Sequence, residues 1–291
     1  MPTIFKDIVT ANDVSFNDPL DVPPEAVVWG LDTMEGWTDS VSLEATSTAR
    51  GAGSDGEVFG SYFSSKARHM VLGGYVWAYD RESAEELMEK LIGDAFPPNA
   101  DILLSRYEPM PKQMVVRVTD KMEFTRLGGD KFRWMVPVAS EKAFKFSLGT
   151  QSYGPVGTAG NSLSGFTFPL TMPLEFTAVV AATDNSLGIM NYGTVDSFCV
   201  ATLTGPLVRG AWRLQNETTN EYIGFDVSAA AGDTLQIDFE NQTATLNGEL
   251  ITSSMFGDFW RLKKRTTNVI KLYASNDPAT TISATARSAW R

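Results

Sequence analysis

Residues 232–248 read Gly232-Asp233-Thr234-Leu235-Gln236-Ile237-Asp238-Phe239-Glu240-Asn241-Gln242-Thr243-Ala244-Thr245-Leu246-Asn247-Gly248, and this stretch decides the fold of the C-terminal region. Two runs of strand-forming residues, 234–239 and 243–246, lie between three pairs of turn formers. The last pair, Asn-Gly, is the strongest short hairpin signal because both residues tolerate positive φ. The stretch therefore predicts successive antiparallel hairpins.

The same spacing of short strands and turns continues on both sides of this stretch. Further strands are predicted at 197–203, 211–215, 222–226 and 269–273. Six or more short strands without a helix signal in about 100 residues are typical of a β-sandwich. We therefore expect a C-terminal sandwich over residues 188–291.

The N-terminal region also favours strands, but it contains one clear helix. Ser83 and Glu86 fit a capping box, an apolar face follows at helical spacing, and Gly93 is a stop signal, so a helix is expected over 83–93. Strands are expected at 27–29, 41–45, 70–78, 102–104, 113–118, 132–138 and 143–148. The pattern predicts a mainly β domain over residues 1–150 with one helix packed on its sheet.

A segment rich in glycine and proline separates the two regions. Eight Gly and Pro residues fall within positions 149–173. Such a composition is typical of a linker, since connections within compact domains are usually short. We expect a linker and connecting strand over 151–187, between the domains 1–150 and 188–291.

The charge of the chain is acidic and unevenly distributed. The net charge is −11 and the pI is about 4.7. Residues 1–187 hold 15 Lys and Arg against 25 Asp and Glu, a net −10, whereas residues 188–291 hold 9 against 10, a net −1. The balance argues against a general nucleic-acid binder, which needs a basic surface to displace counterions.

Most catalytic chemistry is excluded by residue counts. His69 is the one histidine and Cys199 the one cysteine, which rules out multi-histidine zinc sites and an intramolecular disulfide. No G-x-S-x-G nucleophile elbow occurs. His69 reads as an ordinary strand-edge residue and Cys199 as a small buried hydrophobe. We predict no enzyme activity, with no catalytic, cofactor-binding or metal-binding residues.

Three weaker motifs are interpreted as surface features. Residues 51–56 spell G-x-G-x-x-G, but a strand or loop follows instead of the helix that a dinucleotide site requires. Asp238 and Glu240 could form a carboxylate pair, yet alternating acids are usual on a solvated sheet. The basic cluster Arg261, Lys263, Lys264 and Arg265 is expected in a solvated loop or beside an acidic neighbour. The first residues lack the apolar core of a signal peptide, and no stretch approaches the roughly 20 apolar residues of a membrane helix.

The order of these elements resembles the distal tail protein, or minor tail protein, of long non-contractile phage tails. In the N-terminal region the likeness lies in Asp55-Gly56, residues 68–72 before Gly73-Gly74, the helix, residues 113–118 and Ala143-Phe144-Lys145-Phe146. In the C-terminal region it lies in Asn191-Tyr192-Gly193, Thr204-Gly205-Pro206, 232–238, 243–248, Phe259-Trp260-Arg261-Leu262 and Thr267-Asn268-Val269-Ile270. Lys263-Lys264-Arg265 stands where the family usually has Pro-Gly before the asparagine.

The resemblance implies a structural virion protein assembled in the host cytoplasm. Its N-terminal domain would be a tail-tube-like β-barrel or sandwich, six copies of which form a homohexameric ring at the distal end of the tail. The C-terminal domain would be galectin-like. Implied partners are the tail tube protein, the tail-tip hub and fibres, with DNA passing through the lumen unbound and no membrane contact.

Two hypotheses stay open beside this one. A galectin-like domain could bind host-wall carbohydrate, and the C-terminal region offers Trp212, Trp260 and Trp290 as aromatic candidates. The acidity of residues 1–187 could line the ring with negative charge that repels DNA phosphate, with surface solubility as the alternative reason for it.

Overall fold

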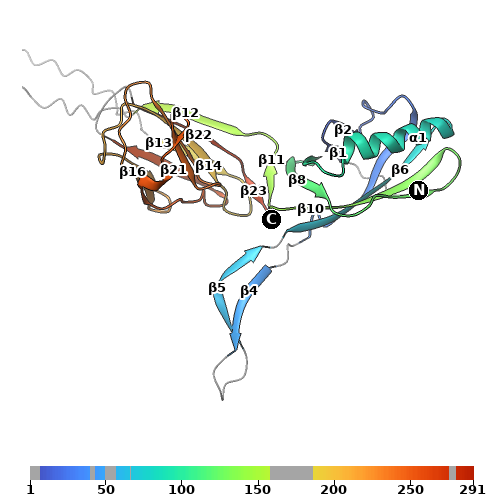
Figure 1. Ribbon diagram of the computed structural model, residues 1–291, viewed down its shortest axis with the longest axis horizontal. Coiled ribbons are helices and arrows are strands. Elements are labelled where there is room, and N and C mark those ends of the chain that lie inside the picture. The colour runs from blue at the N-terminus through green and yellow to red at the C-terminus, as the bar shows by residue number, and fades with distance from the viewer. Residues whose placement is uncertain (1–6, 40–42, 50–56, 66, 158–185, 275–279) are drawn as a thin grey trace, which may run out of the picture. The chain divides into compact units, whose positions relative to one another are not determined.

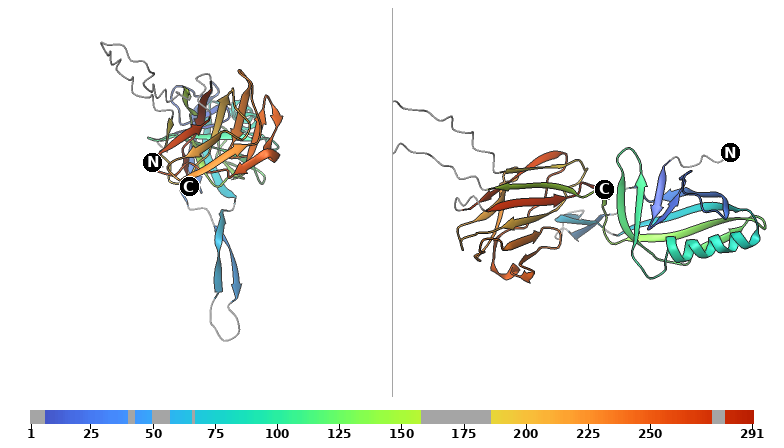
Figure 2. Two further views of the ribbon diagram at one scale, coloured as in Figure 1. Left: turned by 90° about the vertical axis from the view of Figure 1, so that its left-hand side faces the viewer. Right: turned by 90° about the horizontal axis from the view of Figure 1, so that it is seen from above.

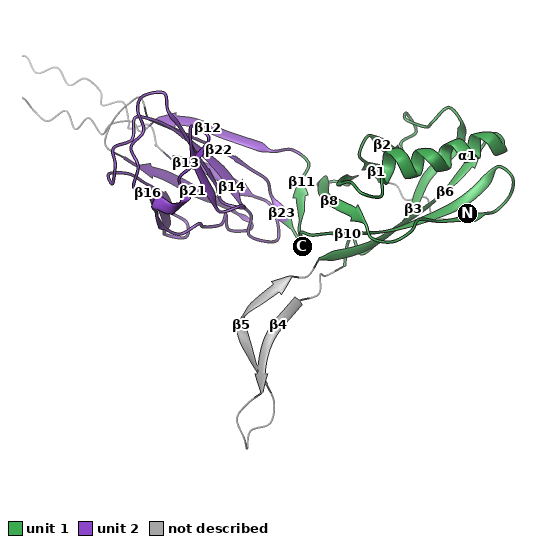
Figure 3. Ribbon diagram, in the orientation of Figure 1, with its two compact units in different colours: residues 1–148, 290–291 green, residues 149–289 purple. Residues whose placement is uncertain are grey.

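The computed structural model describes residues 7–39, 43–49, 57–65, 67–157, 186–274 and 280–291, and only the backbone for 43–49 and 57–65. These residues are mainly β, with one α-helix, and divide into two compact units (Figures 1 and 3). Unit 1 comprises residues 1–148 and 290–291, and unit 2 comprises residues 149–289. Unit 2 is thus inserted between residue 148 and the final dipeptide Trp290-Arg291.

Unit 1 is a nearly closed, barrel-like sheet with a helix packed on it, as expected for the fold class. Its described strands are β1 (Ile8–Ala11), β2 (Val14–Phe16), β3 (Ala26–Glu35), β6 (Arg68–Ala78), β7 (Ile102–Tyr107), β8 (Lys112–Val118), β9 (Glu123–Arg126), β10 (Lys131–Ser140), β11 (Lys145–Ser147) and β23 (Ala289–Trp290). The main path runs in the order β2-β1-β7-β8-β10-β6-β3. A separate hairpin pairs β4 (Leu43–Ala49) with β5 (Glu57–Ser65).

The glycine pair of β6 lets two strands approach closely. Gly74 pairs with Leu31, Gly73 pairs with Thr33, and the register shifts between them, so Asp32 forms a bulge in β3. A Cβ on Gly74 would lie 2.0 Å from the carbonyl oxygen of Gly30, whereas one on Gly73 would lie 3.3 Å from its nearest neighbour. Gly74 is therefore required by the backbone approach, and Gly73 is not.

The helix of unit 1 begins earlier than its sequence signals suggest. Helix α1 spans Arg81–Lys90, and its N-cap is Asp80, whose carboxylate accepts a 2.8 Å hydrogen bond from the backbone N–H of Ser83. A carboxylate serves this position as well as a hydroxyl does, so the expected cap at Ser83 was wrong by three residues. A π-turn, η1 (Leu91–Ala95), extends the helix past the expected stop at Gly93.

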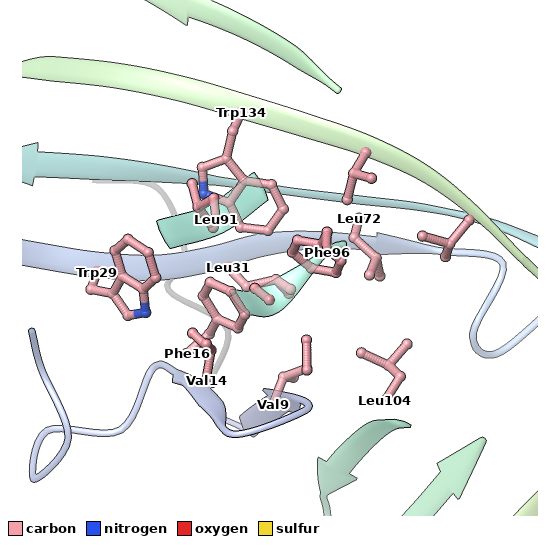
Figure 4. Packing of buried hydrophobic residues seen from close by; sticks show 14 of the residues in the cluster. Val9, Val14, Phe16, Trp29, Leu31, Leu72, Leu91, Phe96, Leu104 and Trp134 are labelled. Atoms are coloured by element: carbon pink, nitrogen blue, oxygen red, sulfur yellow. The ribbon is translucent and has the colours of Figure 1, made fainter. Parts of the chain in front are cut away.

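The core of unit 1 lies between the helix and the sheet. Phe16 stacks on Trp29 with ring centroids 5.4 Å apart, and Trp134 lies 5.4 Å from Phe16 and 5.6 Å from Phe96. Figure 4 shows these rings converging with Leu31, Leu72, Leu91 and Leu104. Burying these side chains is the main favourable free-energy term for folding of the unit.

Unit 2 is a two-layered β-sandwich, as the spacing of its turns predicts (Figure 2). One described sheet has the order β12-β22-β14-β17-β18-β19, and the other β13-β21-β15-β16-β20. The strands are β12 (Gln151–Gly157), β13 (Ser186–Asn191), β14 (Cys199–Thr204), β15 (Arg213–Asn216), β16 (Glu221–Phe225), β17 (Thr234–Asp238), β18 (Thr243–Leu246), β19 (Glu249–Leu250), β20 (Met255–Gly257), β21 (Thr266–Tyr273) and β22 (Thr281–Ala286), with a 3-10 turn, η2 (Thr252–Ser254). β12 pairs with β22, so the first residues of the expected linker 151–187 form a strand of the sandwich.

Candidate assembly surface

Two buried cations fix the segment that leads into the β4–β5 hairpin. The guanidinium of Arg68, at the start of β6, donates hydrogen bonds to the carbonyl oxygens of Gly36 at 2.5 Å, Asp39 at 2.9 Å and Trp37 at 3.3 Å. The ammonium of Lys145 in β11 donates a 2.6 Å bond to the carbonyl of Trp37. Both side chains are buried, and we call this arrangement the cationic clamp.

The clamp is electrostatically costly because two like charges share a buried site. Burial lowers the pKa of Lys145 to about 8, and the charges of Arg68 and Lys112 act in the same direction. Burial also lowers the pKa of Arg68, which Asp39 partly opposes. The hydrogen bonds to main-chain carbonyls therefore offset the free-energy cost of burying these two cations. If the chain at Gly36–Asp39 shifted, the cations would lose these hydrogen bonds.

An exposed apolar pair lies on the outer face of β7 and β8. Leu103 and Val115 are cross-strand partners, with 43% and 50% of their surface exposed. Their neighbours in sequence, Ile102 and Val116, are buried in the core, so this cross-strand pair is apolar on the outer face, next to the polar pair Ser105 and Gln113. An antiparallel sheet that faces water normally carries polar residues on its outer face. We therefore consider the exposed apolar pair a candidate contact for another protein.

A second exposed group surrounds Trp77 on β6. The Trp77 indole donates a 2.9 Å hydrogen bond to Asp130, and the ammonium of Lys131 lies 3.9 Å from the ring centroid. Tyr79 and Leu127, both more than 60% exposed, lie in the loops that follow β6 and β9. These amphipathic groups have the composition typical of interface rims and anchors.

The acidity of the N-terminal region is concentrated in two segments. Residues 7–39 hold eight acids and no Lys or Arg, and residues 80–94 hold six acids against two bases. Residues 101–148 instead hold nine bases against six acids, a net +3. The acidic segments therefore meet a basic set of strands within unit 1.

Three ion pairs join these oppositely charged segments. Arg106 contacts Asp7 at 2.8 Å, Arg126 contacts Glu85 at 3.0 Å, and Arg133 lies 3.9 Å from Asp32. Part of the charge asymmetry thus serves pairing inside unit 1. The exposed acids of the helix segment, Glu82, Glu86 and Glu89, remain as an acidic surface.

His69 and Cys199 lie in different units of the chain. His69 is exposed on β6, opposite Ala139 of β10. Cys199 is buried in β14 of the other unit, and burial raises the pKa of its thiol, with Asp238 acting in the same direction. A protonated buried thiol is a poor nucleophile, which agrees with its interpretation as a core residue.

The remaining polar candidates have structural contacts. Asp238 accepts hydrogen bonds from the backbone N–H groups of Glu240 and Asn241 at 2.9 Å, so it closes the turn between β17 and β18. In the basic cluster, Lys263 lies 3.3 Å from Asp196, which confirms the expected acidic neighbour for that residue. The guanidinium of Arg261 lies 5.1 Å from the Phe198 ring. The G-x-G-x-x-G loop at 51–56 lies outside the described residues.

The three tryptophans considered for carbohydrate binding are core residues. Trp212 stacks on Phe225 with centroids 6.0 Å apart, and Trp260 lies 3.9 Å from Phe239. Trp290 is buried and belongs to unit 1, where the ammonium of Lys112 lies 5.4 Å from its ring. These side chains therefore form no exposed aromatic platform.

Sequence reasoning missed a different aromatic group in unit 2. Tyr222, Phe256 and Tyr273 are exposed on one face of a sheet, although no periodic signal from a single strand brings them together. The described residues hold no group of three or more His, Cys, Asp or Glu that could bind a metal ion. No helix in the described part of the chain is long and apolar enough to cross a membrane.

Comparison with known proteins supplies the context for these surfaces. Residues 192–287 match the family model for the siphovirus-type tail component, C-terminal domain. The crystal structure of the SPP1 Dit protein, described as a paradigm of the hub adsorption apparatus in phages infecting Gram-positive bacteria, matches with a TM-score of 0.65 and 12% identity, over 98% of this chain and 99% of that one. Among curated proteins no relative matches the sequence.

Two structures of the phage P2 baseplate in its activated conformation also match. The one with Ca gives a TM-score of 0.41 at 12% identity, over 97% of this chain and 98% of that one. The one with Sr gives 0.40 at 12% identity, over 96% and 97%.

The family match covers most of unit 2, and the SPP1 Dit fold extends over both units. Both findings agree with the resemblance carried by the sequence. Residues 192–287 thus match the siphovirus-type tail component family, and the chain has the fold of the SPP1 Dit protein.

Proposed function

We propose that the chain is a non-enzymatic subunit of a homohexameric ring at the distal end of a phage tail. The observation that carries the proposal is the apolar outer pair Leu103 and Val115 on a unit that otherwise has a complete core. A Dit fold over the full chain supports the place of such a ring in the tail. In the ring, this face of β7 and β8 packs against the neighbouring subunit.

The ring joins the tail tube protein on one side to the tail-tip hub and its fibres on the other. Unit 1 builds the ring, because it carries the apolar outer pair and the aromatic groups around Trp77. The cationic clamp gives the segment Gly36–Asp39 a fixed geometry, which an assembly contact requires if six subunits are to repeat it. Unit 2 projects its own surfaces to partners of the tail tip.

DNA passes through the lumen of the proposed ring without specific binding. The net charge of −11 opposes adhesion of phosphate, and the bases Arg106, Arg126 and Arg133 are engaged by acids of the same unit. The acidic helix surface at Asp80–Asp94 is the part of unit 1 best suited to repel DNA. A lumen lined by neutral or basic residues would contradict this part of the proposal.

Assembly is tested by negative-stain microscopy and light scattering on the purified chain. We expect six-fold rings, and we expect Leu103→Asp together with Val115→Asp to abolish them while the monomer stays folded. Val208→Asp is the matched control, since Val208 is an exposed apolar residue of unit 2. A monomer across the whole soluble concentration range would overturn the self-assembling ring. Rings that survive the double substitution would exclude the β7–β8 face as the subunit contact.

A further inference from the structure

The two outer faces of the unit 2 sandwich differ in chemistry. The face of the sheet that contains β14 and β17 carries small hydroxyl and amide groups in register, namely Thr202, Thr204, Gln236, Thr245, Ser283 and Thr285. The outer face of the sheet that contains β15 and β21 carries Arg213, Gln215, Tyr222, Phe256, Lys271 and Tyr273, which we call the aromatic face. Only the second face combines rings with cations among the described strands of the sandwich.

The strand register places the members of the aromatic face side by side. Lys271 of β21 pairs with Gln215 of β15, and Gln215 pairs with Tyr222 of β16. In the neighbouring row Tyr273 pairs with Arg213. Phe256 of β20 pairs with Gly224 and lies over it, since a Cβ on this glycine would meet the Phe256 ring at 2.3 Å. The lack of a side chain at Gly224 therefore leaves room for the ring on the face.

The cations of this face are held against aromatic rings. The guanidinium carbon of Arg213 lies 4.8 Å from the Tyr273 ring centroid and 5.7 Å from that of Tyr222. The ammonium of Lys271 lies 5.3 Å from the Tyr273 ring. Tyr273 is fixed in turn, because its hydroxyl donates a 2.6 Å hydrogen bond to Glu217, a contact that raises the pKa of the tyrosine. The group is thus pre-organised before any ligand arrives.

Neither cation has a carboxylate partner in the described part of the chain. Other cations of unit 2 do have one: Arg209 forms a bidentate pair with Asp226, and Lys263 contacts Asp196. In a chain with a net charge of −11, two cations that are left beside open aromatic rings form a local site for an anion. Guanidinium and ammonium groups bind phosphate and carboxylate oxygens through charge-assisted hydrogen bonds.

The rings specify what carries the anionic group. Tyr222, Phe256 and Tyr273 are 36–43% exposed, so part of each ring is accessible to a ligand beside the cations that contact Tyr222 and Tyr273. Aromatic rings can contact the apolar C–H faces of sugar rings, and the hydroxyl of Tyr222 can form hydrogen bonds with sugar hydroxyls. Tyr, Phe and Arg are also enriched at protein–protein interfaces, so a protein ligand is the competing occupant, and the peptide probe below tests for one that presents carboxylates. A nucleic acid would need a larger basic surface than two cations.

We propose that the aromatic face of unit 2 binds an anionic saccharide, a sugar chain that bears phosphate or carboxylate groups. Arg213 and Lys271 bind the anionic group, and the rings of Tyr222, Phe256 and Tyr273 stack against the sugar units on either side. The site is open and shallow, so it accepts an extended polymer of repeating units. This inference is independent of ring formation.

The test is calorimetric titration of the full chain with defined probes. Mannopentaose phosphate and oligogalacturonate represent the phosphate and carboxylate classes, and unphosphorylated mannopentaose is the neutral control. A heptaglutamate peptide presents carboxylates without a sugar. An oligothymidylate presents phosphates together with nucleobases. We expect binding of at least one anionic saccharide and about tenfold weaker binding of the three other probes.

Matched variants locate the site. Arg213→Gln should weaken binding about tenfold, whereas Arg209→Gln, which removes an exposed arginine of the same unit outside the face, should leave it unchanged. Tyr273→Leu, which removes the ring, should weaken binding. Tyr273→Phe keeps the ring and should retain most of the affinity. Circular dichroism checks that each variant is folded.

Several results would overturn the proposal. These are no binding of either anionic saccharide, equal binding of neutral mannopentaose and the anionic saccharide that binds, equal binding of the peptide or the oligonucleotide, and equal losses in Arg209→Gln and Arg213→Gln. Light scattering on the same preparations reports ring formation separately, so a failure of saccharide binding is distinguished from a failure of the proposed ring.

Discussion

The cationic clamp makes the stability of unit 1 depend on pH in an uncommon direction. Burial, together with the charges of Arg68 and Lys112, lowers the pKa of Lys145 from 10.5 to about 8, with Glu108 opposing the shift and Arg106 adding to it. The folded chain therefore releases this proton before the unfolded chain does. Stability should be lowest below pH 8, where both states carry the charge, and should rise as the pH increases from 8 toward 10.5.

The size of the effect follows from the shift. A difference of 2.5 units between 10.5 and 8 corresponds to about 3.4 kcal/mol, and halving it for screening by water leaves about 1.5–2 kcal/mol. Between pH 7 and pH 9.5 the free energy of unfolding should therefore rise by about 1 kcal/mol from this group. Lys145→Met removes the charge, and the carbonyl of Trp37 keeps its hydrogen bond from Arg68. This variant should be at least as stable as the parent at pH 7.

The assay is urea unfolding of both proteins at pH 7 and pH 9.5. The difference in unfolding free energy between the parent and Lys145→Met isolates the contribution of the Lys145 charge. The buried thiol of Cys199 has a raised pKa and destabilises the fold as the pH rises. Because both proteins contain this thiol, its contribution cancels in the difference. Lys142→Met, at an exposed lysine, is the matched control. If the difference stays constant between the two pH values, or if Lys142→Met reproduces it, the clamp does not work as described.

Three further predictions concern packing. Gly74→Ala should destabilise the chain by several kcal/mol because the new Cβ clashes with the carbonyl of Gly30, whereas Gly73→Ala should cost about 1 kcal/mol or less. Thermal unfolding of the two variants measures both losses, and equal losses would contradict the described geometry. Phe16→Ala should lower the free energy of unfolding in urea by about 3–5 kcal/mol. Leu20→Ala, at a 95% exposed site, should lower it by less than about 0.5 kcal/mol. Similar values for the two variants would mean that Phe16 does not belong to the core. Cys199 should react with iodoacetamide only when the protein is unfolded, as measured by mass spectrometry; modification of the native chain would contradict its burial.

Much of the architecture follows from local patterns in the sequence. The hairpin dipeptides place β17 and β18 within one residue of their observed bounds, and the apolar spacing finds α1. Strands β1 and β2 were not predicted, since each has only three or four residues among turn formers. Their stability comes from pairing with β7 and from Phe16 in the core, and neither is visible in a local window.

The candidate sites were less accessible to sequence reasoning. Trp212 and Trp260 were natural choices for a sugar platform, but the largest apolar side chains gain most from burial, and the sandwich uses them as core. The aromatic face depends on the register between β15, β16, β20 and β21, which brings together residues up to 60 positions apart. The cationic clamp likewise joins Arg68 and Lys145 through main-chain carbonyls, which leave no mark in the sequence.

The insertion of unit 2 between residue 148 and Trp290 has a consequence for the order of synthesis on the ribosome. Unit 1 receives its last two residues only after all 141 residues of unit 2 have been translated. Unit 1 therefore completes its structure last, after the sandwich has been made. The same arrangement joins unit 2 to unit 1 at two junctions, so a different sandwich inserted at these junctions would leave the sequence of unit 1 unchanged.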